Sequence, residues 1–143
     1  MNQMIRLLLI FVLVIASSSV GFGEVITEPV GVSPRYVSAG EVSCDMAPGL
    51  GMKLNMFAGL EPKNDSSVDE VRITLKVINF ATGGVVYNKT FDAEYNYLTD
   101  YYEVRETYTA PTTGNYYMRV TYKPYKDGVL LETITQSSVV VSV

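Results

Sequence analysis

Apolar and polar residues alternate along most of the chain with a period of two. The segment Glu70–Phe80 shows this most clearly, because every second residue from Val71 to Val77 is apolar and the residues between them are polar. This period predicts a β-strand with one buried and one solvated face. Beyond the N-terminal region, no ten-residue window places its apolar residues at helical spacing. We therefore expect an all-β fold.

Turn residues separate the alternating segments. The run Ala81-Thr82-Gly83-Gly84 divides Glu70–Phe80 from a second segment, Val85–Phe91, and two adjacent glycines favour a turn. The two segments are predicted to form a hairpin. Lys126-Asp127-Gly128 is the strongest hairpin turn in the sequence, because Asp-Gly tolerates the positive φ angles that a tight turn requires.

The same alternation predicts five further strands. They are Val30–Ser38, Leu50–Ala58, Tyr101–Thr109, Tyr116–Lys123, and one long, kinked final strand that joins Val129–Gln136 to Ser138–Val143. Breaks or solvated loops are expected at Ala39-Gly40, Pro48-Gly49, Glu61–Asp69 and Ala110–Gly114. Seven short strands without intervening helices predict an antiparallel sandwich of two sheets.

The first 23 residues differ from the rest. Arg6 is followed by an unbroken apolar run, Leu7–Ala16, and then by small residues that include Gly21 and Gly23. This order of charge, apolar core and small residues is typical of a secretory signal peptide, and we expect cleavage before Glu24. The alternative is an uncleaved membrane anchor, because the uncharged stretch reaches the lower limit of a membrane span. In both cases residues 24–143 are expected to form one domain outside the cytoplasm.

Charge argues against two classes of partner. Loss of Arg6 lowers the count of Lys and Arg from 11 to 10, against 15 Asp and Glu, so residues 24–143 carry a net charge of −5. No run of Lys or Arg occurs. Nucleic acid is therefore not an expected partner, and a membrane is expected to be contacted only through residues 1–23, if they are retained.

The sequence lacks the residues that several chemistries need. It has no histidine, which excludes Ser-His-Asp and Cys-His catalysis and histidine-based zinc sites. Two carboxylate groupings occur, but neither has the spacing of a calcium loop; they are Asp92 with Glu94, and Asp65 with Asp69 and Glu70. We expect no enzyme activity, no metal and no cofactor.

Cys44 is the single cysteine, so no disulfide can form within the chain. Its environment is predicted to be that of a small buried hydrophobic residue. The alternative is a disulfide between two chains, or a reactive thiol.

Two surface features are candidate sites. Tyr95, Tyr97, Tyr101 and Tyr102 lie close together around a predicted loop. They form either an interaction surface, since tyrosine gives a large contact area at little entropic cost, or ordinary cover for a sheet face. The two Asn-x-Ser/Thr sequons are candidate glycosylation sites, at Asn64 and Asn88.

The stretch Gly114-Asn115-Tyr116-Tyr117-Met118 resembles the start of strand F in immunoglobulin-like domains, where the motif is Gly-x-Tyr-x-Cys. Tyr116 takes the position of the tyrosine that forms the "tyrosine corner", and Met118 takes the place of the cysteine. The segment from Tyr108 to Val120 also resembles fibronectin-III-like and CARDB-like repeats of microbial surface proteins. Because the chain has neither tryptophan nor a cysteine pair, the resemblance implies the disulfide-free microbial branch of this seven-stranded fold.

These observations predict a secreted or cell-surface module that binds a protein or glycan partner, which includes a second copy of itself. The alternative is a structural subunit of an extracellular filament or surface layer. It is motivated by the extended Glu24–Val32 and the alternating Val139–Val143, either of which could complete the sheet edge of a neighbouring copy.

N-terminal sequencing of the protein from its native host is expected to begin at or near Glu24. The reason is the small residues at Gly21 and Gly23, which fit the positions that a signal peptidase reads. Recovery of an intact Met1 in the membrane fraction would instead establish the anchor.

Overall fold

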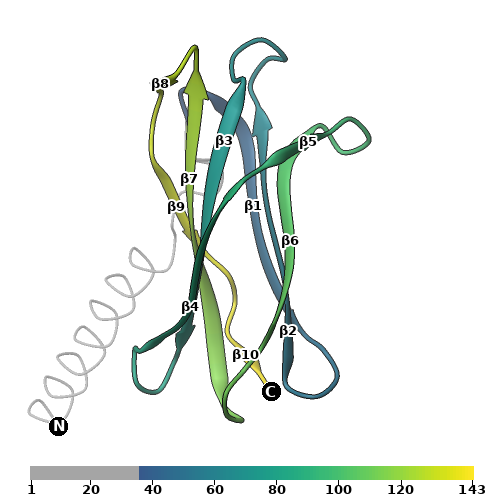
Figure 1. Ribbon diagram of the computed structural model, residues 1–143, viewed down its shortest axis with the longest axis vertical. Helices are drawn as coiled ribbons and strands as arrows, with labels where there is room; N and C mark the ends of the chain where they lie inside the picture. The colour runs from purple at the N-terminus through teal and green to yellow at the C-terminus, as the bar shows by residue number, and fades with distance from the viewer. Residues whose placement is uncertain (1–35) are drawn as a thin grey trace, which may run out of the picture. The chain divides into compact units, whose positions relative to one another are not determined.

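The computed structural model describes residues 36–143 (Figure 1). The predicted signal or anchor at residues 1–23 and the segment Glu24–Val32 lie outside the described residues, as does most of the predicted strand Val30–Ser38. Within the described part of the chain, no helix has both the length and the apolar character needed to span a membrane.

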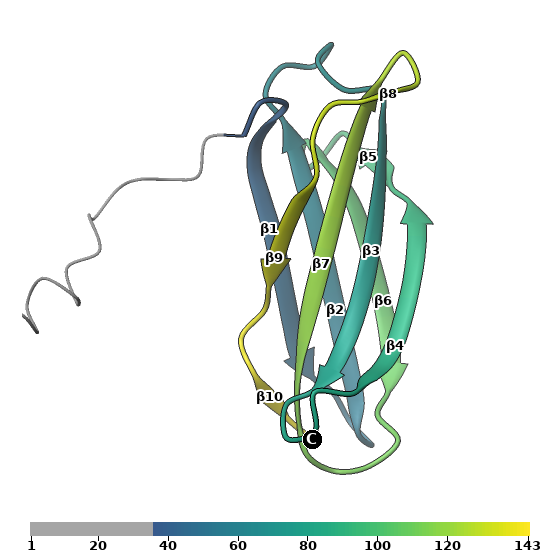
Figure 2. The ribbon, with the colours of Figure 1, turned by 90° about the vertical axis from the view of Figure 1, so that its left-hand side faces the viewer.

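Residues 36–143 form two antiparallel sheets that pack face to face as a sandwich (Figure 2). The first sheet has the order β1 (Ala39–Pro48), β2 (Lys53–Pro62), β6 (Tyr101–Thr109), β5 (Glu94–Asn96). The second has the order β10 (Val141–Ser142), β7 (Asn115–Lys126), β3 (Glu70–Asn79), β4 (Val85–Asp92), and β7 also pairs with β8 (Val129–Leu130) and β9 (Ile134–Ser137). The all-β class and the two-sheet architecture are thus confirmed, and the sandwich is compatible with an immunoglobulin-like domain.

The central strands β3 and β7 supply most of the core of the second sheet. They pair along almost their whole length, with Leu75 opposite Val120 and Ile73 opposite Tyr122. Every second residue of each strand is completely buried, as the period of two predicted. The first sheet contributes three fully buried side chains of β2 to the same core, those of Leu54, Ala58 and Leu60.

Tyrosine hydroxyls inside the sandwich donate hydrogen bonds across the core. Tyr122 on β7 donates to the backbone carbonyl of Ser43 on β1, and Tyr108 on β6 donates to the carbonyl of Val86 on β4 at 2.9 Å. Each bond joins one sheet to the other. No buried side-chain nitrogen or oxygen among residues 36–143 lacks a partner.

Tyr116 lies at the start of β7 and is completely buried. Its hydroxyl donates to the backbone carbonyl of Thr112 at 2.8 Å and lies 3.0 Å from the Thr112 hydroxyl. Gly114 makes the preceding bend with a φ of 155°, a region that glycine enters readily, and exchanges two backbone hydrogen bonds with Val143. This is the hydrogen-bond geometry of a tyrosine corner.

The predicted strand boundaries were wrong at both ends of the domain. Ala39-Gly40 was expected to be a break, but it begins β1, an edge strand that the alternation did not reveal because its three buried residues, Ala39, Val42 and Met46, do not recur at every second position. The predicted strand Leu50–Ala58 is β2, displaced toward the C-terminus, and it runs into the expected loop Glu61–Asp69 as far as Pro62.

The prediction of a single final strand was also wrong, because this segment forms the three short strands β8, β9 and β10. The described residues therefore contain ten strands in place of the predicted seven. Ser138 explains one interruption, since its side-chain oxygen accepts from the amide of Met118 at 2.9 Å, where a strand would offer a carbonyl. The strand β10 pairs with β7 of its own chain, so Val141 and Ser142 complete their own sheet.

Asp92 and Glu94 do not form one carboxylate pair on a continuing strand. The chain leaves the second sheet at Ala93, whose amide donates to the carbonyl of Val71, and then enters the first sheet. Asp92 lies opposite Arg72 in one sheet, whereas Glu94 lies opposite Glu103 in the other.

Replacement of Tyr116 by Phe is expected to lower the free energy of unfolding by about 1 kcal/mol, since it deletes one buried hydrogen bond and keeps the ring. Tyr117→Phe is the matched control. Tyr117 is the next residue along β7 and faces outward between Phe80 and Arg119, so its change should be near neutral. Urea melts of both variants measure the difference in the free energy of unfolding. If Tyr117→Phe lowers it more than Tyr116→Phe does, the strand register is wrong.

Cys44 is half-buried on the inner face of β1. Burial, with a smaller effect of the Asp45 charge, raises the pKa of its thiol to about 12. In the native protein at pH 8, the rate of reaction with a chromogenic disulfide reagent is therefore expected to be about a thousandfold below that of an ordinary thiol. The rate should return to normal in denaturant. A covalent dimer on a non-reducing gel would favour the disulfide between chains.

Candidate functional site

The hairpin of β5 and β6 carries the predicted tyrosine cluster, and its tip stands clear of the two sheets (Figure 1). The tip is built around Asn96. The carbonyl of Asn96 accepts from the amide of Asp100 at 2.8 Å, and its side-chain oxygen accepts from the amide of Leu98 at 3.0 Å. Asp100 has a φ of 61°, the left-handed conformation that closes the turn. The tip is thus held by its own hydrogen bonds.

Glu103 fixes this tip to the first sheet. Its carboxylate accepts hydrogen bonds from the side-chain amide of Asn96 at 2.9 Å, from the Thr99 hydroxyl at 3.2 Å and from the Arg105 guanidinium at 3.3 Å. The bond from Asn96 is the largest cause of the lowered pKa of Glu103; partial burial opposes it, and Arg105 and Thr99 add to it. The carboxylate is therefore charged at neutral pH and clamps the turn.

The structure brings three of the four predicted tyrosines together. The ring of Tyr95 lies 5.0 Å from that of Tyr97 at 82°, and 5.1 Å from that of Tyr102 at 61°, measured between centroids. Such steep arrangements are favourable for aromatic pairs. Tyr97 is 84 % exposed, and Tyr102 extends into the domain, where its hydroxyl donates to the carbonyl of Val68 at 3.3 Å.

Tyr101 does not join this cluster. It points to the outer face of the first sheet, because neighbouring residues of a strand alternate. There it packs beside Phe57 over Gly59, where an added Cβ would come within 2.8 Å of the Tyr101 ring. Tyr101 therefore covers a glycine of the sheet and is not part of the exposed surface around Tyr97.

A hollow of about 340 Å³ opens beside the three tyrosines, and its other lining residues are Asp65 and Asp100. We call this the tyrosine hollow. Asp65 comes from the loop between β2 and β3 and was not predicted to lie near the hairpin. Among residues 36–143, neither carboxylate has a cationic side-chain nitrogen within 4.0 Å. The hydroxyl of Tyr95 donates to Asp100 at 3.2 Å.

The electrostatic environment of the tyrosine hollow is negative. Partial burial raises the pKa of Tyr95, and the charge of Asp100, its hydrogen bond with Tyr95, and the charge of Asp65 raise it further. Partial burial likewise raises the pKa of Tyr102, with a smaller effect from the charge of Asp69. The contribution from burial disfavours any charge, but the contributions from the carboxylates mark a negative potential that favours a positive charge at the same place.

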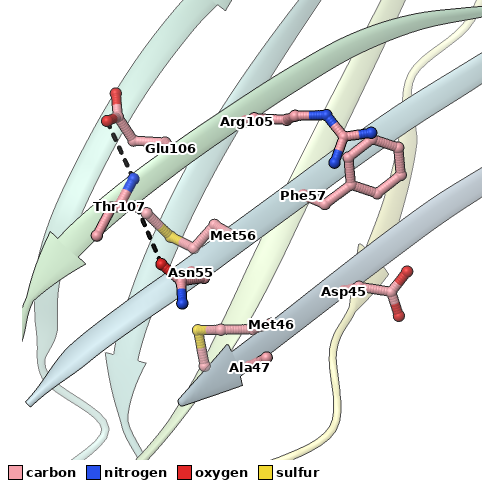
Figure 3. A pocket seen from close by; sticks show the side chains of 9 residues that line it. All are labelled: Asp45, Met46, Ala47, Asn55, Met56, Phe57, Arg105, Glu106 and Thr107. Atoms are coloured by element: carbon pink, nitrogen blue, oxygen red, sulfur yellow. Dashed lines mark hydrogen bonds between the residues drawn. The ribbon is translucent and has the colours of Figure 1, made fainter. Parts of the chain in front are cut away.

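A larger, open groove of about 610 Å³ crosses the first sheet, and Figure 3 shows its lining. Its nine residues come from β1, β2 and β6 and are Asp45, Met46, Ala47, Asn55, Met56, Phe57, Arg105, Glu106 and Thr107. The sequence did not identify this surface, because its residues are far apart along the chain.

Most polar groups of this groove already have partners. The guanidinium of Arg105 lies 4.6 Å from the centre of the Phe57 ring and bonds to Glu103. The hydroxyl of Thr107 donates to Asn55 at 3.1 Å (Figure 3). A ligand would have to displace these bonds, whereas the tyrosine hollow offers carboxylates without a cation. The hollow is therefore the better candidate site.

Both sequon asparagines are exposed. Asn64 lies in the loop that follows β2, and Asn88 lies on the outer face of β4, opposite Lys76. Their side chains face solvent, so both positions are open to a modifying enzyme. Their use as glycosylation sites remains a prediction.

The carboxylates that sequence analysis grouped around the loop point to different partners. Asp69 pairs with Lys126 at 3.6 Å, and Glu70 pairs with Arg72 at 2.7 Å. Asp65 lies apart from them in the tyrosine hollow. In the described part of the chain, no three His, Cys, Asp or Glu side chains are close enough to share a metal ion.

Comparison with known proteins assigns the chain to no family. No family model and no curated protein matches the sequence. Among solved structures, a family 76 glycoside hydrolase from a bovine Bacteroides thetaiotaomicron strain is similar at 15 % identity, with a TM-score of 0.38, over 71 % of this chain and 20 % of that protein. A protein assigned as a beta-galactosidase from Bacteroides fragilis is similar at 12 % identity, with a TM-score of 0.36, over 67 % of this chain and 15 % of that protein. The chain thus spans a fifth or less of either.

Proposed function

We propose that this protein is an exported, immunoglobulin-like module that acts by binding at the cell surface or in the extracellular space, without catalysis. The contact surface is the tip of the β5–β6 hairpin with the tyrosine hollow. The observation that carries this proposal is the exposure of Tyr97 and Leu98, at 84 % and 95 %, on a turn that hydrogen bonds hold in shape. Large apolar side chains displayed on a rigid turn bind at a low entropic cost.

A binding role also fits the chemistry of the site. The tyrosine hollow offers aromatic rings and acceptor oxygens, which suit recognition. It contains no nucleophile with a neighbouring base, and the sequence has no histidine to supply one. The proposed partner is a protein or a glycan that the exported module meets outside the cytoplasm.

A second candidate function, a subunit of a surface assembly, is favoured by the charges of the two outer faces. Strand alternation places acids mainly on the first sheet, which carries Glu41, Asp45, Glu61, Glu94 and Glu103 against Lys53 and Arg105. It places bases mainly on the second, which carries Arg72, Lys76, Arg119 and Lys123 against Glu70 and Asp92. Opposite faces of two copies are thus complementary, and such a head-to-tail contact builds a filament where the rotation between copies does not close into a ring.

Binding of the labelled exported protein to cells of its native host tests the leading proposal. Tyr97→Ala is expected to weaken saturable binding about tenfold, since it removes an exposed aromatic anchor. Phe80→Ala is the matched control, because Phe80 is an aromatic residue exposed by 60 % in a different turn, and it should change binding less than twofold.

Equal losses in both variants, or no saturable binding, would contradict the proposed surface. Sedimentation of the unlabelled protein tests the second candidate function, that of a subunit of a surface assembly. Growth into large species at low salt that dissolve at high salt would favour the assembly of complementary faces.

A further inference from the structure

We propose that the tyrosine hollow is a binding site for a compact organic cation of the alkylammonium class, such as a quaternary ammonium group or the side chain of a lysine. This inference rests on the proposed binding function and names the chemistry that the contact surface recognises. The first argument is the shape of the hollow. The ring of Tyr95 is in edge-type contact with those of Tyr97 and Tyr102, so the three rings are not coplanar and line the hollow from different directions.

Rings in this arrangement suit a rounded cationic group. The face of an aromatic ring carries partial negative charge and attracts a cation within about 6 Å of its centre. Several rings at steep angles surround an ammonium head from different sides, whereas a sugar ring lies best on one flat, exposed ring face. The observed angles of 82° and 61° favour the cation.

The carboxylates provide the second argument. Asp65 and Asp100 approach the rings from two different loops, and no cationic side chain of residues 36–143 lies within 4.0 Å of either. Asp69, which follows Asp65 in the same loop, already has its partner in Lys126. The hollow therefore keeps a negative charge that an incoming cation neutralises.

A metal ion fits this site less well than an organic cation. A calcium ion takes six to eight oxygen ligands, and the hollow offers only two carboxylates, one of them bonded to the hydroxyl of Tyr95. The remaining walls are ring faces, which bind an alkylammonium group through its charge and its methyl or methylene surface together.

The site is open and preformed. Tyr97 is 84 % exposed, and the turn that carries it is fixed by Asn96 and Glu103. Tyr102 is fixed from the other side by its hydrogen bond to Val68. A ligand can therefore enter from solvent without rearrangement of the hairpin, as a free cation or as a cationic group displayed on a larger molecule.

Titrations of the full exported protein, followed by NMR, test the proposal with choline, a peptide containing trimethyl-lysine, and 3,3-dimethylbutan-1-ol. The alcohol has the shape of choline without its charge. Both cations are expected to bind saturably, and the alcohol about tenfold more weakly or not at all. Tighter binding of choline would identify the natural ligand as a free cation or a lipid headgroup. Tighter binding of the peptide would identify it as a side chain displayed on a protein.

Variants locate the site. Tyr97→Ala is expected to weaken cation binding by roughly two- to thirtyfold, Tyr97→Phe much less, and the control Phe80→Ala not at all. Asp65→Asn should weaken it at low salt and have a smaller effect at high salt. Thermal melts check that each variant is folded.

Equal binding of choline and its neutral analogue, or cation binding that Tyr97→Ala leaves unchanged, would overturn the proposal. Binding of methyl glycosides in place of cations would assign the hollow to glycans. If the cations do not bind but Tyr97→Ala still weakens cell binding, the ligand class is wrong and the binding function stands. If Tyr97→Ala leaves cell binding intact, the proposed function fails as well.

Discussion

A tyrosine hydroxyl inside this sandwich must keep a hydrogen-bond partner, and that requirement ties the two sheets together. The chain has no tryptophan and no disulfide to join them. The ring of Tyr122 fills the core and the partly buried ring of Tyr108 packs against it, and both tyrosines donate their hydroxyls to backbone carbonyls of the facing sheet. An unpaired buried hydroxyl or carbonyl costs about 1–3 kcal/mol, so a shifted register would be penalised at several points at once.

The position of the candidate site depends on the same kind of bond. The hydroxyl of Tyr102 donates to the carbonyl of Val68, a buried residue just before β3, and this bond holds the loop between β2 and β3 against the hairpin. Asp65 belongs to that loop, so its approach to Tyr95 follows from the anchoring of Tyr102. The hollow is therefore a consequence of how the core closes at this end of the domain.

How far the sequence predicts this structure depends on how much of each strand is buried. The central strands β3 and β7 have one fully buried face, and their alternation located both correctly. The edge strand β1 buries few residues and was missed. Within the site, the period of two places Tyr101 and Tyr102 on opposite faces, but nothing local signals that Asp65 would meet Tyr95, because a long loop brings them together.

The two open surfaces of the domain differ in how their charges are satisfied. On the first sheet, the exposed Arg105 lies over the Phe57 ring and pairs with Glu103, so its charge already has a partner within the chain. In the tyrosine hollow, the hydroxyl of Tyr102 has a partner in the carbonyl of Val68, while the carboxylate of Asp65 has no cationic partner among residues 36–143 and lies beside the exposed ring of Tyr97. Folding alone explains the first arrangement, because every group there stabilises another. It does not explain the second, in which rings and a carboxylate are held in place and left without a cation, and this asymmetry is why we propose recognition at the hairpin tip.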